Sequence, residues 1–247
     1  TQTAPKLMQK IVVLNPKGGS GKTTIATNVA AYYAIAGNRV ALMDYDRQAS
    51  SARWVAARPP ERPSIALVKA FERNSRMTRT WQLHATRGAT NIVIDTPAGA
   101  TREDLQEITR DAHAVVIPVL PSEIDIHAAS RCIGDLLLCA KIKPRDGRIG
   151  VVANRVKKNT RVYQALLRFL KALEIPFITS LRDAQAYVHA AGLGQGIFEL
   201  PRHRAKVDLE SWEPLLAWLT GDNEVTNARP AVGRSPELRK HIETGIR

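Results

Sequence analysis

The sequence is poor in cysteine and in long apolar runs. Its two cysteines among 247 residues, Cys132 and Cys139, form no CxxC pair, so we expect buried, reduced thiols rather than disulfides or a zinc site. His113 and His127 have no histidine or cysteine partner at ligand spacing, and we interpret both as structural. No apolar run approaches the roughly 18 residues of a membrane-spanning helix, and no signal-peptide pattern precedes the first apolar run. These absences favour a cytoplasmic protein.

Acidic side chains are also scarce relative to basic ones. The chain has 36 Lys and Arg against 23 Asp and Glu, for a net charge of +13. The excess is concentrated between Lys141 and Lys206, where fourteen basic residues accompany four acidic ones. A basic region of this density indicates a polyanionic partner, nucleic acid first and an acidic membrane surface second. A generally basic, solvated surface is the alternative that composition leaves open.

What the sequence does contain is a regular alternation of short apolar runs and helical patterns. Several runs are continuously apolar, which is typical of parallel strands covered on both faces. We expect strands at 10–14, 39–43, 65–68, 91–94, 114–119, 149–153 and 176–179, and helices at 22–36, 101–111, 122–140, 159–173, 183–191 and 209–219. This alternation predicts an α/β fold with a doubly wound, mostly parallel sheet and helices on both faces.

The pattern divides the chain into one domain, residues 1–220, and a polar C-terminal tail, residues 221–247. The end of the tail could form a short helix with three aliphatic residues on one side. An interfacial membrane helix usually carries more apolar and aromatic anchors, so we do not expect the tail to bind a membrane.

The stretch LNPKGGSGKTT, residues 14–24, lies between a predicted strand and a predicted helix, as a phosphate-binding loop requires. Its three glycines let backbone N–H groups turn toward phosphate oxygens, and the helix N-terminus adds positive partial charge. Lys22 is expected to neutralise phosphate oxygens, and Thr23 to bind Mg²⁺ through its hydroxyl group. A phosphate loop needs one lysine, so the second, Lys17, requires another explanation.

Four motifs, in this order, resemble those of the ParA/MinD family of deviant Walker A ATPases. They are KGGSGKT (17–23), LMDYDRQASS (42–51, a switch segment), IVIDTPAG (92–99, a Walker B strand) and VVANRVKKN (151–159). All four occur at the ends of predicted strands, where ligands bind in such sheets. The resemblance covers roughly residues 10–219. It is strongest to small ParA-type partition and positioning ATPases, because too few residues precede the first strand for an N-terminal helix-turn-helix domain.

The resemblance implies a role for the second lysine. In the family, a lysine at the position of Lys17 crosses an ATP-dependent homodimer interface and touches the phosphates held by the other subunit, where it offsets negative charge. Asp125 is implied to brace the same interface, or else it complements a helix dipole. The implied site comprises catalytic Lys17, Lys22 and Asp46; nucleotide-binding Lys17, Gly18, Gly19, Ser20, Gly21, Lys22, Thr23, Thr24, Asn154 and Pro201; and, for Mg²⁺, Thr23, Asp44 and Asp95.

Individual roles in this set also follow from the resemblance. Asp46 is implied to orient or deprotonate the attacking water, and Asp95 to hold Mg²⁺ through water. Asp44 is implied to lie near the metal, although an aspartate at a strand end is often a loop cap. Asn154 is implied to hydrogen-bond the adenine edge, and Pro201 to wall the base pocket.

The basic C-terminal half indicates a DNA-binding member of the family. In ParA proteins, nonspecific DNA binding uses arginines that follow the last strands. The residues expected to contact double-stranded DNA are Arg182, Arg202, Arg204, Lys206, Lys157 and Lys158, with Arg161 as an extension. No aromatic residues interleave these charges, which favours duplex phosphates over single strands. A solvated face is the alternative for any one of them.

The resulting hypothesis is an ATP-dependent partition or positioning ATPase. It dimerises around ATP, binds DNA nonspecifically on the nucleoid, and is released when a ParB-like or cargo-adaptor protein stimulates hydrolysis. The cargo is left open between a plasmid, a chromosome and a protein assembly such as a carboxysome. One alternative is a MinD-like membrane-cycling regulator. Another is a DNA-binding factor that no longer hydrolyses ATP, against which intact Lys17, Lys22, Asp46 and Asp95 argue.

Overall fold

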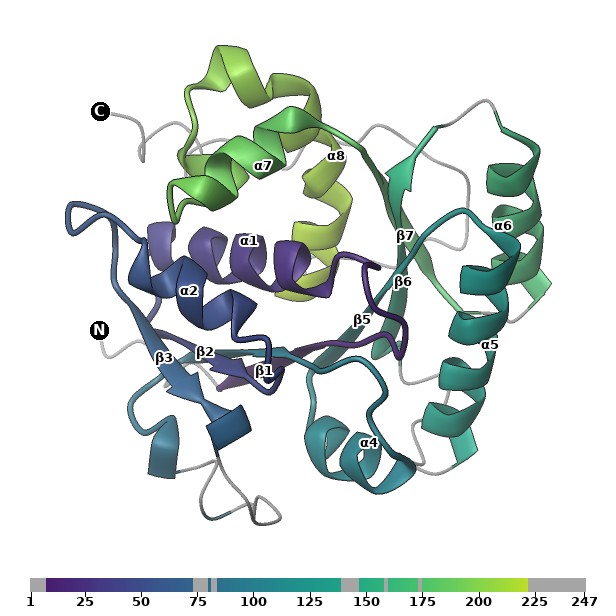
Figure 1. The fold of residues 1–247 in the computed structure, drawn as a ribbon, viewed down its shortest axis with the longest axis horizontal. Coiled ribbons are helices and arrows are strands. Elements are labelled where there is room, and N and C mark those ends of the chain that lie inside the picture. The colour runs from purple at the N-terminus through teal and green to yellow at the C-terminus, as the bar shows by residue number, and fades with distance from the viewer. Residues whose placement is uncertain are drawn as a thin grey trace.

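The centre of the structure is a parallel β-sheet of seven strands (Figure 1). The computed structural model describes residues 8–72, 80, 84–138, 147–157, 160–172 and 175–221. The strands are β1 (Gln9–Val13), β2 (Val40–Asp44), β3 (Ile65–Lys69), β4 (Asn91–Asp95), β5 (Ala114–Val119), β6 (Ile149–Val156) and β7 (Phe177–Arg182). They pair in the order β3-β2-β4-β1-β5-β6-β7. The predicted α/β fold and all seven predicted strands are confirmed.

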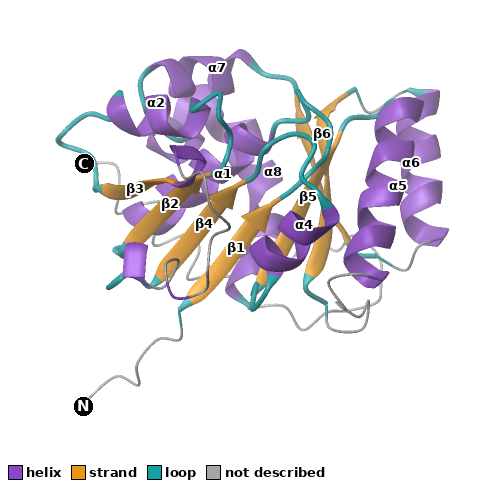
Figure 2. Cartoon of the chain, turned by 60° about the horizontal axis from the view of Figure 1, so that its bottom comes forward, coloured by secondary structure: helices purple, strands orange, loops and turns teal. Residues whose placement is uncertain are grey.

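Helices cover both faces of the sheet (Figure 2). They are α1 (Lys22–Ile35), α2 (Ser50–Ala56), α4 (Arg102–Thr109), α5 (Glu123–Leu138), α6 (Arg161–Ala172), α7 (Gln185–Gly192) and α8 (Arg202–Thr220). Helices α1, α2, α7 and α8 pack into one hydrophobic core, and α4, α5 and α6 into the other. Strand β1 supplies both, because Ile11 and Val13 face the first core while Val12 faces the second. Within the described residues, no helix is long and apolar enough to cross a bilayer.

The carboxyl ends of β1, β2 and β4 are level with one another. In the parallel register, Asp95 at the end of β4 is the partner of Val13 at the end of β1 and of Asp44 at the end of β2. The loop that follows β1 therefore lies beside two strand-end carboxylates. In open parallel sheets this edge is where ligands bind, so the sheet itself positions the candidate site.

Two helices differ from the sequence-based expectation. Helix α2 was not predicted, because it has only seven residues and Trp54 is its one large buried side chain. Helix α8 begins at Arg202 rather than near 209, and its first turns bury Ala205 and Asp208, which are too small or too polar to signal a core face. It ends at Thr220. The predicted boundary of the domain at residue 220 stays a prediction, because the tail from residue 222 onward lies outside the described residues.

The cysteine and histidine expectations have separate outcomes. Cys132 is buried, and burial raises the pKa of its thiol to about 12, whereas Cys139 lies outside the described residues. His113 and His127 are both exposed. Among the described residues, no group of three or more His, Cys, Asp or Glu side chains is arranged to hold a metal ion.

The segment that follows α2 is joined to residues 194–199 by a buried ion pair. The two terminal nitrogens of the Arg58 guanidinium, Nη1 and Nη2, donate to the Glu199 carboxylate at 2.8 Å. The Arg58 and Glu199 side chains are only 4% and 1% exposed. The central carbon of the Arg58 guanidinium lies 5.3 Å from the centroid of the Trp54 ring. The indole N–H of Trp54, in α2, donates to the Gln195 carbonyl at 3.1 Å. A buried bidentate pair of this kind is costly to break on one side only, so α2 and residues 194–199 are held as one unit.

Gly194 lies so close to the backbone that follows α2 that a side chain at this position should lower the stability of the fold. Its φ is +63°, and a Cβ atom there would lie 2.4 Å from the Ala57 carbonyl carbon. We expect Gly194→Ala to lower the free energy of unfolding by roughly 2 kcal/mol, because both the backbone conformation and the contact oppose it. Urea unfolding measures the change.

Gly192→Ala is the matched control for this substitution. Gly192 ends α7, and nothing lies within 4 Å of a Cβ atom built there. Alanine favours the helix over glycine, so this variant should unfold at the same or higher urea concentration than the wild type. Equal behaviour of the two variants would contradict the described contact.

Candidate nucleotide-binding site

The loop between β1 and α1 is shaped as an open cradle of backbone groups. Gly19 and Gly21 have φ values of +78° and +93°, and space is open beside Gly18 and Gly19. The Asn15 side chain fixes the start of the loop, since its amide donates to the Pro118 carbonyl at 2.6 Å and its oxygen accepts the Lys17 N–H at 2.8 Å. Successive N–H groups in such a turn form an anion-binding nest.

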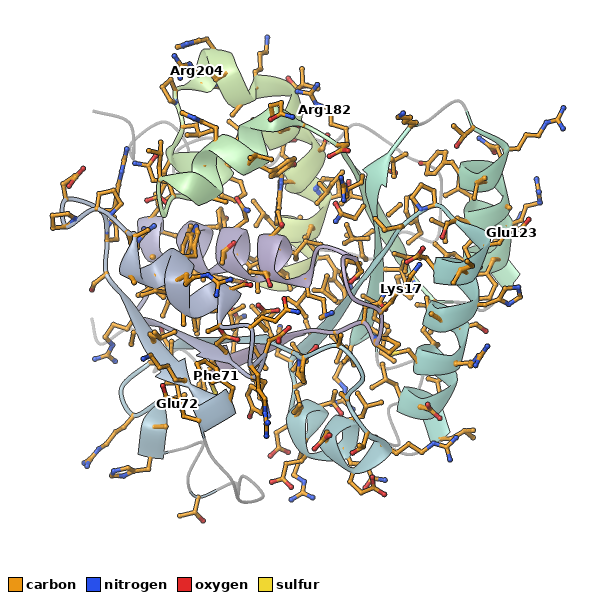
Figure 3. The ribbon with its side chains drawn as sticks, in the orientation of Figure 1. Lys17, Phe71, Glu72, Glu123, Arg182 and Arg204 are labelled. Atoms are coloured by element: carbon orange, nitrogen blue, oxygen red, sulfur yellow. The ribbon has the colours of Figure 1, made fainter. Side chains whose placement is uncertain are left out.

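The two lysines of the loop point in different directions. Lys22 is buried and folds back into its own loop, where its ammonium group donates to the Lys17 carbonyl at 3.1 Å. Burial is the main cause that lowers the pKa of Lys22, opposed by the nearby carboxylates of Asp95 and Asp46. The Lys17 ammonium instead leaves the loop and lies beside α5 (Figure 3). The lysine expected to serve its own phosphates is thus the one inside the cradle.

The Lys17 side chain ends on Asp125, in the first turn of α5. The ammonium and a carboxylate oxygen are 2.7 Å apart, and the Lys17 side chain is 35% exposed while that of Asp125 is 2% exposed. The Ser122 hydroxyl donates to the same Asp125 oxygen, and the other oxygen is buried without a hydrogen-bond partner among the described residues. Asp125 therefore braces Lys17 directly. The ion pair with Lys17 explains why the Asp125 carboxylate is buried, whereas an acid that only complements a helix dipole could stay exposed.

Asp95 is the most constrained acid of the site. The hydroxyls of Thr23 and Ser51 both donate to its Oδ2 atom at 2.7 Å. Burial raises the pKa of its carboxyl to about 6, and the two hydroxyl bonds oppose that rise. Its Oδ1 atom is buried and has no hydrogen-bond partner among the described residues. The two residues expected to serve Mg²⁺, Thr23 and Asp95, are thus in direct contact, and one carboxylate oxygen has no partner among the described residues.

Sequence reasoning missed Ser51. It lies in the first turn of α2, within the switch segment, and its side chain is fully buried. Its hydroxyl joins the switch segment to the Walker B strand through Asp95. In the sequence, Ser51 is only a serine a few positions after Asp46, and serines are common in such segments. Its role becomes visible only when α2 directs its side chain toward Asp95.

Asp44 and Asp46 have different surroundings within the switch segment. Asp44 is fully buried, and its two oxygens accept the backbone N–H groups of Asp46 at 3.0 Å and Ala52 at 2.9 Å. Burial raises the pKa of Asp44, and these backbone bonds oppose the rise. Asp46 is half-buried, and among the described residues its carboxylate accepts a hydrogen bond from the Gln48 N–H at 3.0 Å. Asp44 shapes the segment, while Asp46 carries its carboxylate near the Lys22 ammonium.

Asn154 and Pro201 are not equivalent in this structure. Asn154 is 6% exposed at the end of β6, and its amide donates to the Ser20 carbonyl of the phosphate loop at 2.9 Å. Pro201 is exposed and precedes the first turn of α8. The adenine contacts expected of both residues stay predictions.

The predicted DNA-binding cations separate into two groups. Arg202, Arg204 and Lys206 are exposed on the first turns of α8, and Figure 3 shows Arg204 at the periphery of the molecule. Arg182 instead makes a bidentate ion pair with the buried carboxylate of Asp208, at 2.8 and 2.9 Å. Asp208 already balances the charge that we expected Arg182 to present to DNA.

The remaining members of that set lie elsewhere. Lys157 is exposed just after β6, and Arg161 is exposed at the start of α6. Lys158 lies outside the described residues. Contact of any of these side chains with DNA stays a prediction.

Comparison with known proteins matches most of the chain to one family. Residues 11–197 match the model described as the CobQ/CobB/MinD/ParA nucleotide binding domain. The chain is similar to the maintenance of carboxysome distribution protein A of Gloeobacter kilaueensis, with 33% identity over 177 residues, covering 66% of this chain and 78% of that protein. The protein of the same name from Halothiobacillus neapolitanus is 28% identical over 200 residues, covering 80% and 91%.

Solved structures agree with the fold. Apo McdA of Cyanothece has a TM-score of 0.68 at 17% identity, covering 87% of this chain and all of that one. The MinD cell division protein of Aquifex aeolicus has a TM-score of 0.61 at 21% identity, covering 81% and 94%. At identities this low, the likeness shows only that the fold is shared.

The raised pKa of Asp95 predicts a pH-dependent stability in metal-free, nucleotide-free protein. Its carboxyl titrates near 6 when folded and near its ordinary value, 3.8, when unfolded, so between these values the folded state binds more protons. Stability contributed by this group is therefore lost as pH rises from about 4 to about 6. We expect Asp95→Asn, which cannot ionise, to be more stable than the wild type above pH 6, by up to about 3 kcal/mol.

Urea unfolding of both proteins in EDTA, from pH 4 to pH 7.5, measures this difference. Glu210→Gln removes an exposed carboxylate on α8 and is the charge-matched control. A difference between the wild type and Asp95→Asn that stays constant with pH would contradict the raised pKa.

Proposed function

The chain belongs to the CobQ/CobB/MinD/ParA family of nucleotide-binding domains, as an ATPase of the ParA/MinD type, and we propose that it positions a cargo by an ATP-driven cycle on DNA. In this cycle ATP binds the phosphate loop and drives formation of a homodimer. The dimer binds double-stranded DNA without sequence preference. Hydrolysis to ADP and phosphate, stimulated by a partner protein on the cargo, releases it.

The direction of the Lys17 side chain carries this proposal. A lysine that served its own nucleotide would fold into the cradle, as Lys22 does through its bond to the Lys17 carbonyl. Lys17 instead extends out of the loop, partly exposed, with Asp125 as its support. It is thus placed where a facing subunit could receive it. Two nucleotides in one interface concentrate negative charge, which a lysine from each subunit would offset.

The residues around Asp95 fit the Mg²⁺ ion that accompanies ATP in such enzymes. The Thr23 hydroxyl and the unpartnered Oδ1 atom of Asp95 are oxygen ligands, which Mg²⁺ prefers, and Asp95 would act directly or through water. The ion would supply charge neutralisation at the phosphates. Lys22 would add its ammonium group to the same phosphates, and Asp46, whose charge raises the pKa of Lys22 against the larger effect of burial, would orient the attacking water.

DNA binding is assigned to the exposed cations of α8. Arg202, Arg204 and Lys206 are close in sequence on its first turns, and an ATP-driven dimer would double their number. Arg182, which is engaged by Asp208, is expected to contribute less. Contacts of this kind bind phosphates and carry no sequence information, which suits a protein that uses the nucleoid as a surface.

The cargo and its adaptor are inferred from the named relatives. Two are carboxysome distribution proteins, and the chromosome-partitioning ATPase Soj of Thermus thermophilus is 45% identical over 51 residues. We propose a cytoplasmic, nucleoid-associated protein whose cargo is a protein assembly or a DNA molecule, recognised through an adaptor. No observation on the described residues favours the membrane-cycling alternative, whose anchor would be the tail beyond them.

The two lysines should respond differently to substitution. Lys22→Ala should weaken ATP binding at least tenfold, because it removes a charged hydrogen-bond donor from the cradle. Lys17→Ala should leave ATP binding within about threefold of wild type but abolish ATP-dependent dimerisation, since its ammonium group lies outside its own cradle. Calorimetry measures binding, and sedimentation velocity with and without ATP measures dimerisation.

Lys171→Ala, an exposed lysine on α6, is the charge-matched control and should behave as wild type in both assays. A Lys17→Ala protein that dimerised normally with ATP would remove the observation on which the proposal rests.

Reversing the charges on α8 should weaken DNA binding without stopping hydrolysis. Arg202→Glu combined with Arg204→Glu removes about four phosphate contacts per dimer, so the slope of log affinity against log salt should flatten by roughly 3 to 4. Anisotropy of two unrelated labelled duplexes with ATP, across a salt series, measures the effect. Both duplexes should lose affinity alike.

Arg87→Glu combined with Arg110→Glu makes the same change of charge at exposed arginines outside the α8 surface. If this control lost as much affinity as the α8 variant, net charge rather than the α8 surface would explain binding. Loss for only one duplex would contradict nonspecific phosphate contact.

A further inference from the structure

The side chain of Asn154 is directed at the phosphate loop. Its Nδ2 atom donates to the Ser20 carbonyl oxygen at 2.9 Å, and the residue is only 6% exposed. Its Oδ1 atom accepts the N–H of the following residue, Arg155, at 3.0 Å. Each end of the amide therefore makes one hydrogen bond within the protein, and a second N–H donor and a second lone pair remain on the side chain.

The backbone after Asn154 is in a conformation that residues other than glycine seldom adopt. Arg155 has φ +52°, which costs of order 1 kcal/mol or more for such a residue. The pairing of β6 with β7 also shifts register between Ala153 and Val156. The Arg155 side chain forms an exposed ion pair with Asp183 at 3.2 Å. The strand end thus departs from regular geometry at the point where Asn154 turns toward the loop.

The absence of a side chain on Gly21 leaves room for the Asn154 amide. A Cβ atom on Gly21 would lie 2.0 Å from the Asn154 Nδ2 atom, and the φ of Gly21 is +93°. The loop therefore admits Asn154 only because position 21 has no side chain. Two residues 133 positions apart in the chain act as one contact.

The Ser20 carbonyl and the Gly21 N–H belong to one peptide unit, which fixes what the contact does. In a planar trans peptide the C=O and N–H bonds point in opposite directions. Holding the carbonyl on Asn154 therefore aims the Gly21 N–H away from Asn154. Glycine permits rotation of the peptide units beside it. A flip of this unit would turn a carbonyl oxygen, rather than an N–H donor, toward an anion in the loop.

We propose that Asn154 is a positioning residue for the phosphate loop: its amide locks the Ser20–Gly21 peptide with the N–H facing the phosphates. This inference rests on the proposed nucleotide-binding function. It gives Asn154 a role at the loop in addition to the adenine contact that the sequence motif implied. The loop contact controls phosphate affinity, which every ligand with the same phosphates shares.

The test compares ligands that share phosphates but differ in base. ATP, GTP and inorganic tripolyphosphate, each with Mg²⁺, displace a fluorescent ATP analogue from the wild type and from Asn154→Ala and Asn154→Asp. We expect Asn154→Ala to weaken tripolyphosphate about tenfold and both nucleotides by at least as much, because the lost bond acts on the cradle. Asn154→Asp keeps the shape of the side chain but lacks the donor, so its loss should be at least as large.

Loss for ATP alone, with tripolyphosphate unaffected, would show that Asn154 acts on the base and not on the loop, and would overturn the proposal. Unchanged affinity for every ligand would overturn it as well. A wild type that bound none of the three would refute the proposed nucleotide-binding function instead. Thermal melting of each variant reports folding, and the isosteric Asn154→Asp serves if Asn154→Ala does not fold.

A double-mutant cycle tests the contact itself. Gly21→Ala should weaken binding strongly, because its Cβ displaces the Asn154 amide. Adding Asn154→Ala to Gly21→Ala should then cost less than it does in the wild type, where the bond is intact. Independent, multiplying losses in the double variant would mean that the two positions do not act through one contact, and the proposal would fail.

Discussion

The buried carboxylate of Asp95 holds together three segments that are distant in the sequence. It ends β4, and its Oδ2 atom accepts the hydroxyl of Thr23 from α1 and that of Ser51 from α2, each at 2.7 Å. An ionisable group this deeply buried is expensive unless its partners are in place. The parallel register that sets β4 level with β1 and β2 brings those partners within reach. The geometry of the site therefore depends on satisfying one acid.

Side chains rather than regular secondary structure hold the remaining backbone of the site. When the N–H groups of a loop bind an anion, they cannot also form the hydrogen bonds of a helix or strand. Asn15 and Asn154 hold the phosphate loop through their amides, and Asp44 holds the switch segment through two backbone N–H groups. Short amide and carboxylate side chains suit this task, because each contacts the backbone at a fixed reach.

The strands and the phosphate loop could be predicted from the sequence because their signals are local. Continuous apolar runs mark β1, β4 and β5, and the glycines and lysines of the loop are consecutive. The features that were missed depend on distant partners. Helix α2 is too short for a periodic pattern, and Ser51 acquires its role only when that helix faces Asp95. Arg182 reads as an available cation until Asp208, 26 positions away, is found beneath it.

The buried pair of Arg58 and Glu199 constrains how this protein can recombine with its relatives. The two residues lie 141 positions apart, so a crossover almost anywhere in the middle of the gene would separate them. A hybrid that kept Arg58 but received a neutral residue at position 199 would leave a guanidinium desolvated against the Trp54 ring, with nothing to balance it. A functional hybrid must therefore keep the segment after α2 and the segment before α8 from the same parent, although they lie far apart in the chain.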